Sequence, residues 1–153
     1  MALTDSLVAY WKLNEASGNR ADSVGTNTLT DVNTVTQATT CAETNSAQFT
    51  AANSEALTIT DNTDLSTGNI DFCFALWVYA DSWGTDRALL AKHNPTGNQR
   101  EYIVKYSNAV LRYQLLVSST GASYDGSVSA NTFGAPGTGA CHFVYCYHDS
   151  VNN

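Results

Sequence analysis

The chain has 153 residues, with 14 acidic and 7 basic side chains and a formal net charge of −7. Nucleic acids and anionic membrane surfaces are bound by clustered Lys and Arg, and the basic residues here are scattered along the chain. We therefore expect neither partner. With 43% apolar residues the chain is predicted to fold, and its length predicts a single domain over residues 1–153.

Targeting signals are not visible in the sequence. The first residues lack a basic segment followed by a long apolar stretch, and the longest apolar run, residues 72–80, is too short to span a bilayer. We expect no membrane insertion. The four cysteines allow three disulfide pairings or none. A core of this size holds without disulfides, so we favour free, buried thiols and leave bridges open.

Short β-branched and aromatic runs recur about every ten residues between Gly, Asn, Asp and Ser clusters, and helical periodicity is almost absent. This pattern predicts an all-β sandwich. The expected strands, in chain order, are residues 7–13, 26–36 with a break at 31–33, 47–49, 57–60, 70–79, 87–92, 101–106, 110–117, 123–128 and 142–148.

Two of these runs predict how their strands are buried. Residues 72–79 are apolar at both alternating sets of positions, which predicts a strand in the middle of a sheet, covered on both faces. Along residues 111–117 the odd positions Leu111, Tyr113, Leu115 and Val117 are apolar, which predicts one face toward the core.

The order of these segments resembles the laminin-G-like, concanavalin A-like jelly-roll domains. The resemblance rests on six stretches in order: residues 7–18, 47–49, 57–59, 70–79, 87–92 and 142–150. It implies an antiparallel two-sheet jelly roll, and it places Trp77 at a core position, where we expect the side chain to be packed. Members of the family continue through a hairpin strand and a closing strand, whereas this chain stops at Asn153. We therefore expect a sandwich that lacks its closing strands, either as a fragment or with a neighbouring chain supplying them.

Enzymatic and zinc sites are weakly supported. Retaining glycosidases need two carboxylates about 5–5.5 Å apart, and none of the four glutamates begins the Glu-x-Asp-x-x-Glu pattern of laminarinase-like enzymes. We expect no catalysis. His142, Cys146 and His148 share one face of an expected strand, but its ends lie about 20 Å apart at roughly 3.3 Å per residue, too far for one ion.

Binding residues are expected in the loops. Trp83 is a loop tryptophan among polar residues, suited to stacking on a sugar ring, with anchoring of the loop as the alternative interpretation. The predicted carbohydrate-binding residues are Trp83, Asp81, Asp86, Tyr124 and Asp125. Laminin-G-like domains often hold calcium through loop oxygens, and the densest oxygen cluster predicts calcium ligands at Asp61, Asn62 and Asp64, although such residues are also ordinary turn formers.

These observations predict a non-enzymatic binding or structural module that engages glycans or neighbouring protein subunits and is assembled or oligomeric. The surface, rich in Thr, Asn and Ser (19, 14 and 14 residues), is typical of proteins outside cells. The resemblance favours a virion-associated protein, such as a capsid decoration or tail-fibre protein. The alternatives are a secreted calcium-dependent lectin module of a larger protein and, less favoured, a glycoside hydrolase.

Overall fold

The computed structural model describes residues 6–39, 41, 45–130 and 132–151. The chain divides into two compact units, Met1–Asp64 and Leu65–Asn153. All strand pairs in the described part are antiparallel, and helix is limited there to two 3-10 turns, η1 (Ala51–Asn53) and η2 (Thr63–Leu65). The all-β prediction is therefore confirmed. Within this part of the chain no helix is long and apolar enough to cross a membrane.

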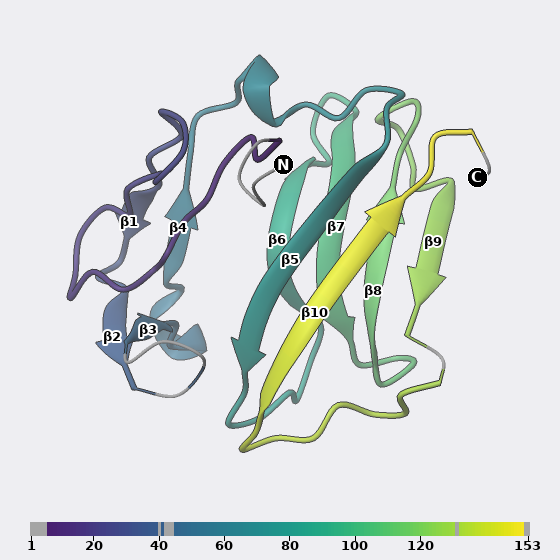
Figure 1. Ribbon diagram of the computed structural model, residues 1–153. Helices are drawn as coiled ribbons and strands as arrows, with labels where there is room; N and C mark the ends of the chain where they lie inside the picture. Colours follow the sequence, from purple (N-terminus) through teal and green to yellow (C-terminus); the bar gives the residue numbers. More distant parts are fainter. Residues whose placement is uncertain (1–5, 40, 42–44, 131, 152–153) are drawn as a thin grey trace. The chain divides into compact units, whose positions relative to one another are not determined.

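The described residues of the first unit form two short strand pairs (Figure 1). β1 (Thr30–Val32) pairs with β4 (Ala56–Thr58), and β2 (Thr36–Ala38) pairs with β3 (Ser46–Gln48). The expected break at residues 31–33 falls later in the chain: Asp31 and Val32 belong to β1, and the strand is interrupted at Asn33 and Thr34, which adopt positive φ angles of 62° and 66°. The expected strand over residues 7–13 is wrong: it is reduced to one bridge, between Trp11 and Asp22.

Polar groups occupy the interior of the first unit. The Arg20 side chain is 0% exposed; its Nη2 donates to the Val35 carbonyl at 3.0 Å and its Nη1 donates to the Gly18 carbonyl. Its Nε lies 3.8 Å from Glu15 Oε2. A buried guanidinium needs such acceptors, because it loses its hydration on folding. Arg20 therefore joins the segment around Gly18 to the start of β2.

Asp22 organises the neighbouring turns of the first unit. Its carboxylate accepts backbone N–H groups of Tyr10 at 2.9 Å, Val24 at 3.0 Å and Asn27 at 3.1 Å. Burial by itself raises the pKa of this carboxyl, but the backbone donors, including Gly25, outweigh it and lower the pKa from 3.8 to about 2. The charged form of Asp22 is therefore the one that holds these turns together.

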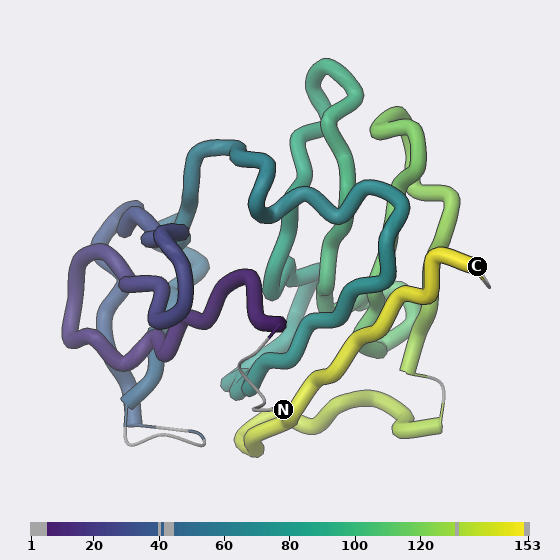
Figure 2. Tube along the Cα trace, turned by 45° about the horizontal axis from the view of Figure 1, so that its top comes forward, coloured from purple at the N-terminus to yellow at the C-terminus, as the bar shows by residue number. Residues whose placement is uncertain are grey.

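The strands described in the second unit form two antiparallel sheets. β5 (Phe72–Tyr79) pairs along its whole length with β10 (Cys141–His148), and the two run side by side in both views (Figures 1 and 2). The other sheet has the order β6 (Arg87–Asn94), β7 (Gln99–Ser107), β8 (Arg112–Val117) and β9 (Gly126–Ser129). These strands match the predicted ones closely, and the arrangement is consistent with a β-sandwich.

Inward-facing side chains of both sheets, joined by one loop tryptophan, form a core in this unit. Its buried members are Val78, Trp83, Tyr102, Val104, Tyr106, Tyr113, Leu115 and Val144. The prediction for residues 111–117 is confirmed within β8, where Tyr113 and Leu115 are buried. Leu111 precedes the strand and is exposed, so it was wrongly included.

The prediction for β5 is wrong. Its residues alternate between inward and exposed positions, and Trp77 is 54% exposed rather than packed in the core. β5 pairs only with β10 in the described part of the chain, which makes a two-stranded sheet rather than a central position. In β5, apolar residues at both alternating sets of positions therefore do not indicate that both faces of the strand are covered.

Two of the four cysteines are free thiols in this unit. Cys73 lies on the exposed face of β5, and Cys146 lies half-buried on the inward face of β10. Burial raises the pKa of the Cys146 thiol. The favoured free state is confirmed for these two residues and is wrong for Cys41 and Cys141, which are disulfide-bonded. The expectation that free thiols are buried is also wrong for Cys73.

Candidate functional site

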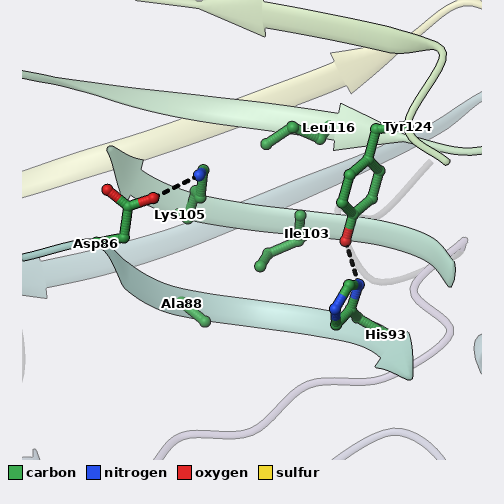
Figure 3. Close-up of a pocket in the computed structure, with 7 residues that line it drawn as sticks. All are labelled: Asp86, Ala88, His93, Ile103, Lys105, Leu116 and Tyr124. Carbon is green, nitrogen blue, oxygen red and sulfur yellow. Dashed lines mark hydrogen bonds and ion pairs between the residues drawn. The ribbon is translucent and has the colours of Figure 1, made fainter. Parts of the chain in front are cut away.

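A groove lies on the outward face of the four-stranded sheet. Inward residues of β7 and β8 alternate with outward ones, so Ile103 and Lys105 on β7 face the same side as Leu116 on β8. Ile103 is directly opposite Leu116 in the register. The groove has a volume of about 390 Å³, and its lining residues are Asp86, Ala88, His93, Ile103, Lys105, Leu116 and Tyr124 (Figure 3).

One end of the groove is charged. Lys105 Nζ lies 2.7 Å from Asp86 Oδ2, and Asp86 Oδ1 accepts the backbone N–H of Asn108 at 2.7 Å. The hydrogen bond from Lys105, followed by that from Asn108, lowers the pKa of the Asp86 carboxyl below its usual value. The Asp86 carboxyl therefore stays ionised at neutral pH, and its charge offsets that of Lys105.

The other end of the groove is aromatic. The rings of His93 and Tyr124 stack at a centroid distance of 5.5 Å and an angle of 13°, and the Tyr124 hydroxyl is hydrogen-bonded to His93 Nδ1 (Figure 3). A register shift between Lys92 and His93 precedes this contact on β6. Such irregularities redirect side chains relative to a regular ladder. Burial raises the pKa of the Tyr124 hydroxyl, although Arg100 opposes this.

The loop that carries Tyr124 is held by several hydrogen bonds. Arg100 Nη1 donates to the carbonyls of Gly121 at 3.0 Å and Ala122 at 2.6 Å. Asp125 Oδ1 accepts the backbone N–H of Ser119 at 3.0 Å. Gly121 has φ +76°, and a Cβ there would lie 1.9 Å from the Asn98 carbonyl oxygen, so only glycine fits. Tyr124 is therefore placed by a rigid loop.

The groove combines features of a small-ligand site. Its volume lies within the range of about 300–1,000 Å³ usual for such pockets. Ala88, Ile103 and Leu116 form an apolar floor between the ion pair and the aromatic pair (Figure 3). Asp86 is the single carboxylate among the seven lining residues. The arrangement offers stacking, apolar contact and hydrogen bonds to a ligand, and no pair of acids.

The structure brings together some of the predicted binding residues and separates others. Asp86 and Tyr124 line the groove. The Asp125 carboxylate accepts hydrogen bonds from Ser119 within the loop next to Tyr124, and these bonds lower the pKa of the carboxyl. Asp81 is exposed in the connection from β5 to β6 and does not line the groove.

Trp83 is not an exposed loop aromatic. It is 8% exposed, its ring stacks on Tyr106 at 4.2 Å and 17°, and it meets Tyr113 edge-on. Its Nε1 donates to the Pro136 carbonyl at 3.0 Å. This corrects the expectation of an accessible sugar-stacking surface: Trp83 anchors its loop to the core, because its indole ring is buried there and its N–H is hydrogen-bonded.

The expected calcium ligands lie between β4 and β5. Asp61 and Asp64 are exposed, and Asn62 is half-buried, with its Nδ2 3.4 Å from the Thr60 carbonyl oxygen. In residues 6–39, 41, 45–130 and 132–151, no group of three or more His, Cys, Asp and Glu side chains could hold a metal ion. His142 and His148 do share the inward face of β10 with Cys146, as expected from their spacing.

Sequence reasoning missed several lining residues, above all His93, Ile103 and Lys105. The alternation along β7 was available as a signal, because the residues between inward-facing Tyr102, Val104 and Tyr106 must face outward. The approach of His93 to Tyr124 had no such signal, since the two are 31 residues apart.

Comparisons with protein-family models, with curated proteins and with solved structures found nothing that matches this chain.

Proposed function

We propose that this protein is a non-enzymatic binding module whose groove on the β6–β9 sheet takes a neutral glycan. The observation that carries the proposal is the aromatic pair at one end of the groove: Tyr124 is fixed by its loop and stacked on His93 above an apolar floor. Sugars present apolar C–H faces that contact aromatic rings and hydroxyls that contact polar groups, and this groove offers both.

Charge supports a neutral ligand. The chain has a net charge of −7, which repels anions over long range. The cation in the groove, Lys105, is paired with Asp86 at 2.7 Å. A sugar hydroxyl can accept a hydrogen bond from the ammonium or donate one to the carboxylate without breaking the pair.

The single carboxylate of the groove supports binding rather than hydrolysis. Glycosidases of the common type require an acid together with a second carboxylate, and Asp86 has no such companion in the lining. Its lowered pKa also makes it a poor proton donor at neutral pH.

The concanavalin A-like jelly roll remains the fold that we propose in detail, and a virion or extracellular surface remains the proposed setting. The two antiparallel sheets of the second unit support the first proposal, and the surface rich in neutral polar residues supports the second. Calcium at Asp61, Asn62 and Asp64 is retained as a proposed accessory ligand.

The test is binding of the intact chain to an array of neutral and acidic oligosaccharides, followed by calorimetry on the best neutral ligand. Tyr124→Ala is expected to weaken binding at least about tenfold, the equivalent of about 1.4 kcal/mol, because the stacking surface is lost. Tyr10→Ala, which removes another exposed tyrosine in the first unit, serves as the matched control and should bind like the wild type.

Retained affinity in Tyr124→Ala, or selective binding of acidic sugars, would contradict the proposed groove. Chelation of calcium with EDTA distinguishes the groove from a calcium-dependent lectin. Unchanged affinity for the glycan supports binding by the groove without calcium, whereas complete loss of affinity would favour a calcium-dependent lectin. Release of reducing sugar from the bound oligosaccharide would contradict the non-enzymatic assignment.

A further inference from the structure

The outward face of the β5–β10 sheet is aromatic and exposed. Five large aromatic side chains project from it, each between 36% and 58% exposed, together with Cys73 and Ala75. The five, here called the aromatic face, are Trp77, Tyr79, Phe143, Tyr145 and Tyr147. A contiguous exposed patch of this kind usually marks an interaction surface.

We infer that the aromatic face binds the same face of a second copy of this chain, forming a two-fold symmetric dimer. This inference is independent of the glycan groove, which lies on the other sheet.

The available area is sufficient for such a dimer. A large aromatic side chain buries about 150–250 Å² when fully covered, so five that are about half exposed offer about 500 Å² per copy. Two copies together would bury about 1,000 Å², which reaches the lower bound for a specific interface. Trp and Tyr are also the residues that contribute most to binding energy at interface centres.

The charge distribution favours the aromatic face over the rest of the surface as the place where two copies of this chain meet. Two copies, each with a net charge of −7, repel each other wherever their acidic surfaces meet. None of the residues that form the aromatic face is charged. Asp71 accepts a hydrogen bond from the Tyr147 hydroxyl at 3.0 Å, which places a charge at one end of the face rather than at its centre.

The arrangement of the rings favours a protein over a flat polysaccharide. Trp77 and Phe143 are direct neighbours in the register, and their rings are 5.1 Å apart with an angle of 51°. Tilted rings do not form the level platform that a crystalline glycan surface requires. They leave ridges and gaps that fit a like surface, as in two sheets packed face to face about 10 Å apart.

The test is sedimentation velocity of the full chain over a range of micromolar concentrations. The wild type is expected to dimerise reversibly, and Phe143→Asp is expected to raise the dimer dissociation constant by more than about tenfold, because it places two carboxylates within an apolar interface. The control is Val110→Asp, which adds the same charge at another exposed apolar residue, in the connection between β7 and β8, and should dimerise like the wild type.

A second measurement follows the aromatic face itself rather than the mass of the particle. Cys73 is a free, exposed thiol on the same face, so its alkylation rate, mapped by mass spectrometry, should fall as wild-type concentration rises and stay constant in Phe143→Asp. A wild type that is monomeric throughout, equal effects of both substitutions, or a monomer that sediments with insoluble polysaccharide through Trp77 would each overturn the inference.

Discussion

The two units of this chain are held together by different chemistry. In the first unit the buried side chains include Arg20 and Asn27, with Val35 as the buried apolar residue in its described part. In the described part of the second unit, seven buried side chains from the two sheets and Trp83 from a loop form a continuous apolar core. Short strands cannot bury a large apolar face, so the first unit relies on hydrogen bonds to specific acceptors.

This difference implies different sensitivities to mutation. A core that depends on buried area loses stability in proportion to the volume removed. A unit that depends on buried polar groups loses stability when a mutation removes a hydrogen-bond donor and leaves its buried acceptor without a partner, or the reverse. Substitutions in the two units therefore test whether the comparison is correct.

The largest effect is expected for Trp83→Ala. Loss of the ring that stacks on Tyr106, and of the hydrogen bond to Pro136, should lower the free energy of unfolding by about 3–5 kcal/mol. Urea denaturation measures this. Trp83→Phe retains most of the ring and should cost about 1–2 kcal/mol. Equal losses for the two variants would mean that the indole N–H, rather than packing, dominates.

The next effect is expected for Arg20→Met in the first unit. The substitution keeps an unbranched apolar chain but leaves the carbonyls of Gly18 and Val35 without their donor, which should cost about 2–3 kcal/mol. Hydrogen exchange in peptides of residues 6–39 should accelerate accordingly. A variant as stable as the wild type would show that the first unit does not depend on its buried arginine.

A smaller, pH-dependent effect is expected at Asp22. Its pKa falls from 3.8 to about 2 on folding, so its contribution is complete above about pH 4 and is lost as the pH falls through 2. After allowance for solvent screening the contribution is about 1 kcal/mol. Thermal unfolding between pH 5 and about pH 2 should therefore show a steeper loss in the wild type than in Asp22→Asn. Parallel profiles would contradict this role.

The smallest effect on the monomer is expected for Trp77→Ala. Because the side chain is 54% exposed, its removal should cost less than about 1 kcal/mol, measured in the Phe143→Asp background to exclude effects of association. Comparison of the free energies of unfolding of Trp77→Ala and Trp83→Ala therefore contrasts a strand tryptophan at the surface with a loop tryptophan in the core. A loss as large as that at Trp83 would contradict the assignment of the two faces.

Local pattern predicted most of the strands in the second unit. β5 to β10 match expected segments, because alternating apolar residues and turn formers act over a few residues. In the first unit the same reasoning failed for residues 7–13, where Leu13 takes a φ of +58° and the chain forms hydrogen-bonded turns around Asp22 instead. The strand propensity of that segment was overridden by contacts with residues further along the chain.

The candidate site could be predicted only in part. Asp86 and Tyr124 were predicted as carbohydrate-binding residues, and both line the groove. Their partners Lys105 and His93 lie 19 and 31 residues away in sequence. Pairing of β6 with β7, and of β7 with β8, brings these residues to one face, and no local pattern contains that pairing.

The sequence by itself determined the all-β class, the position of most strands and the scarcity of positive charge, because each depends on composition or on short-range alternation. Only the tertiary structure decided that Trp83 is buried and Trp77 exposed. Which side of a strand is covered depends on the strands and sheets packed against it, and these contacts join residues far apart in the chain.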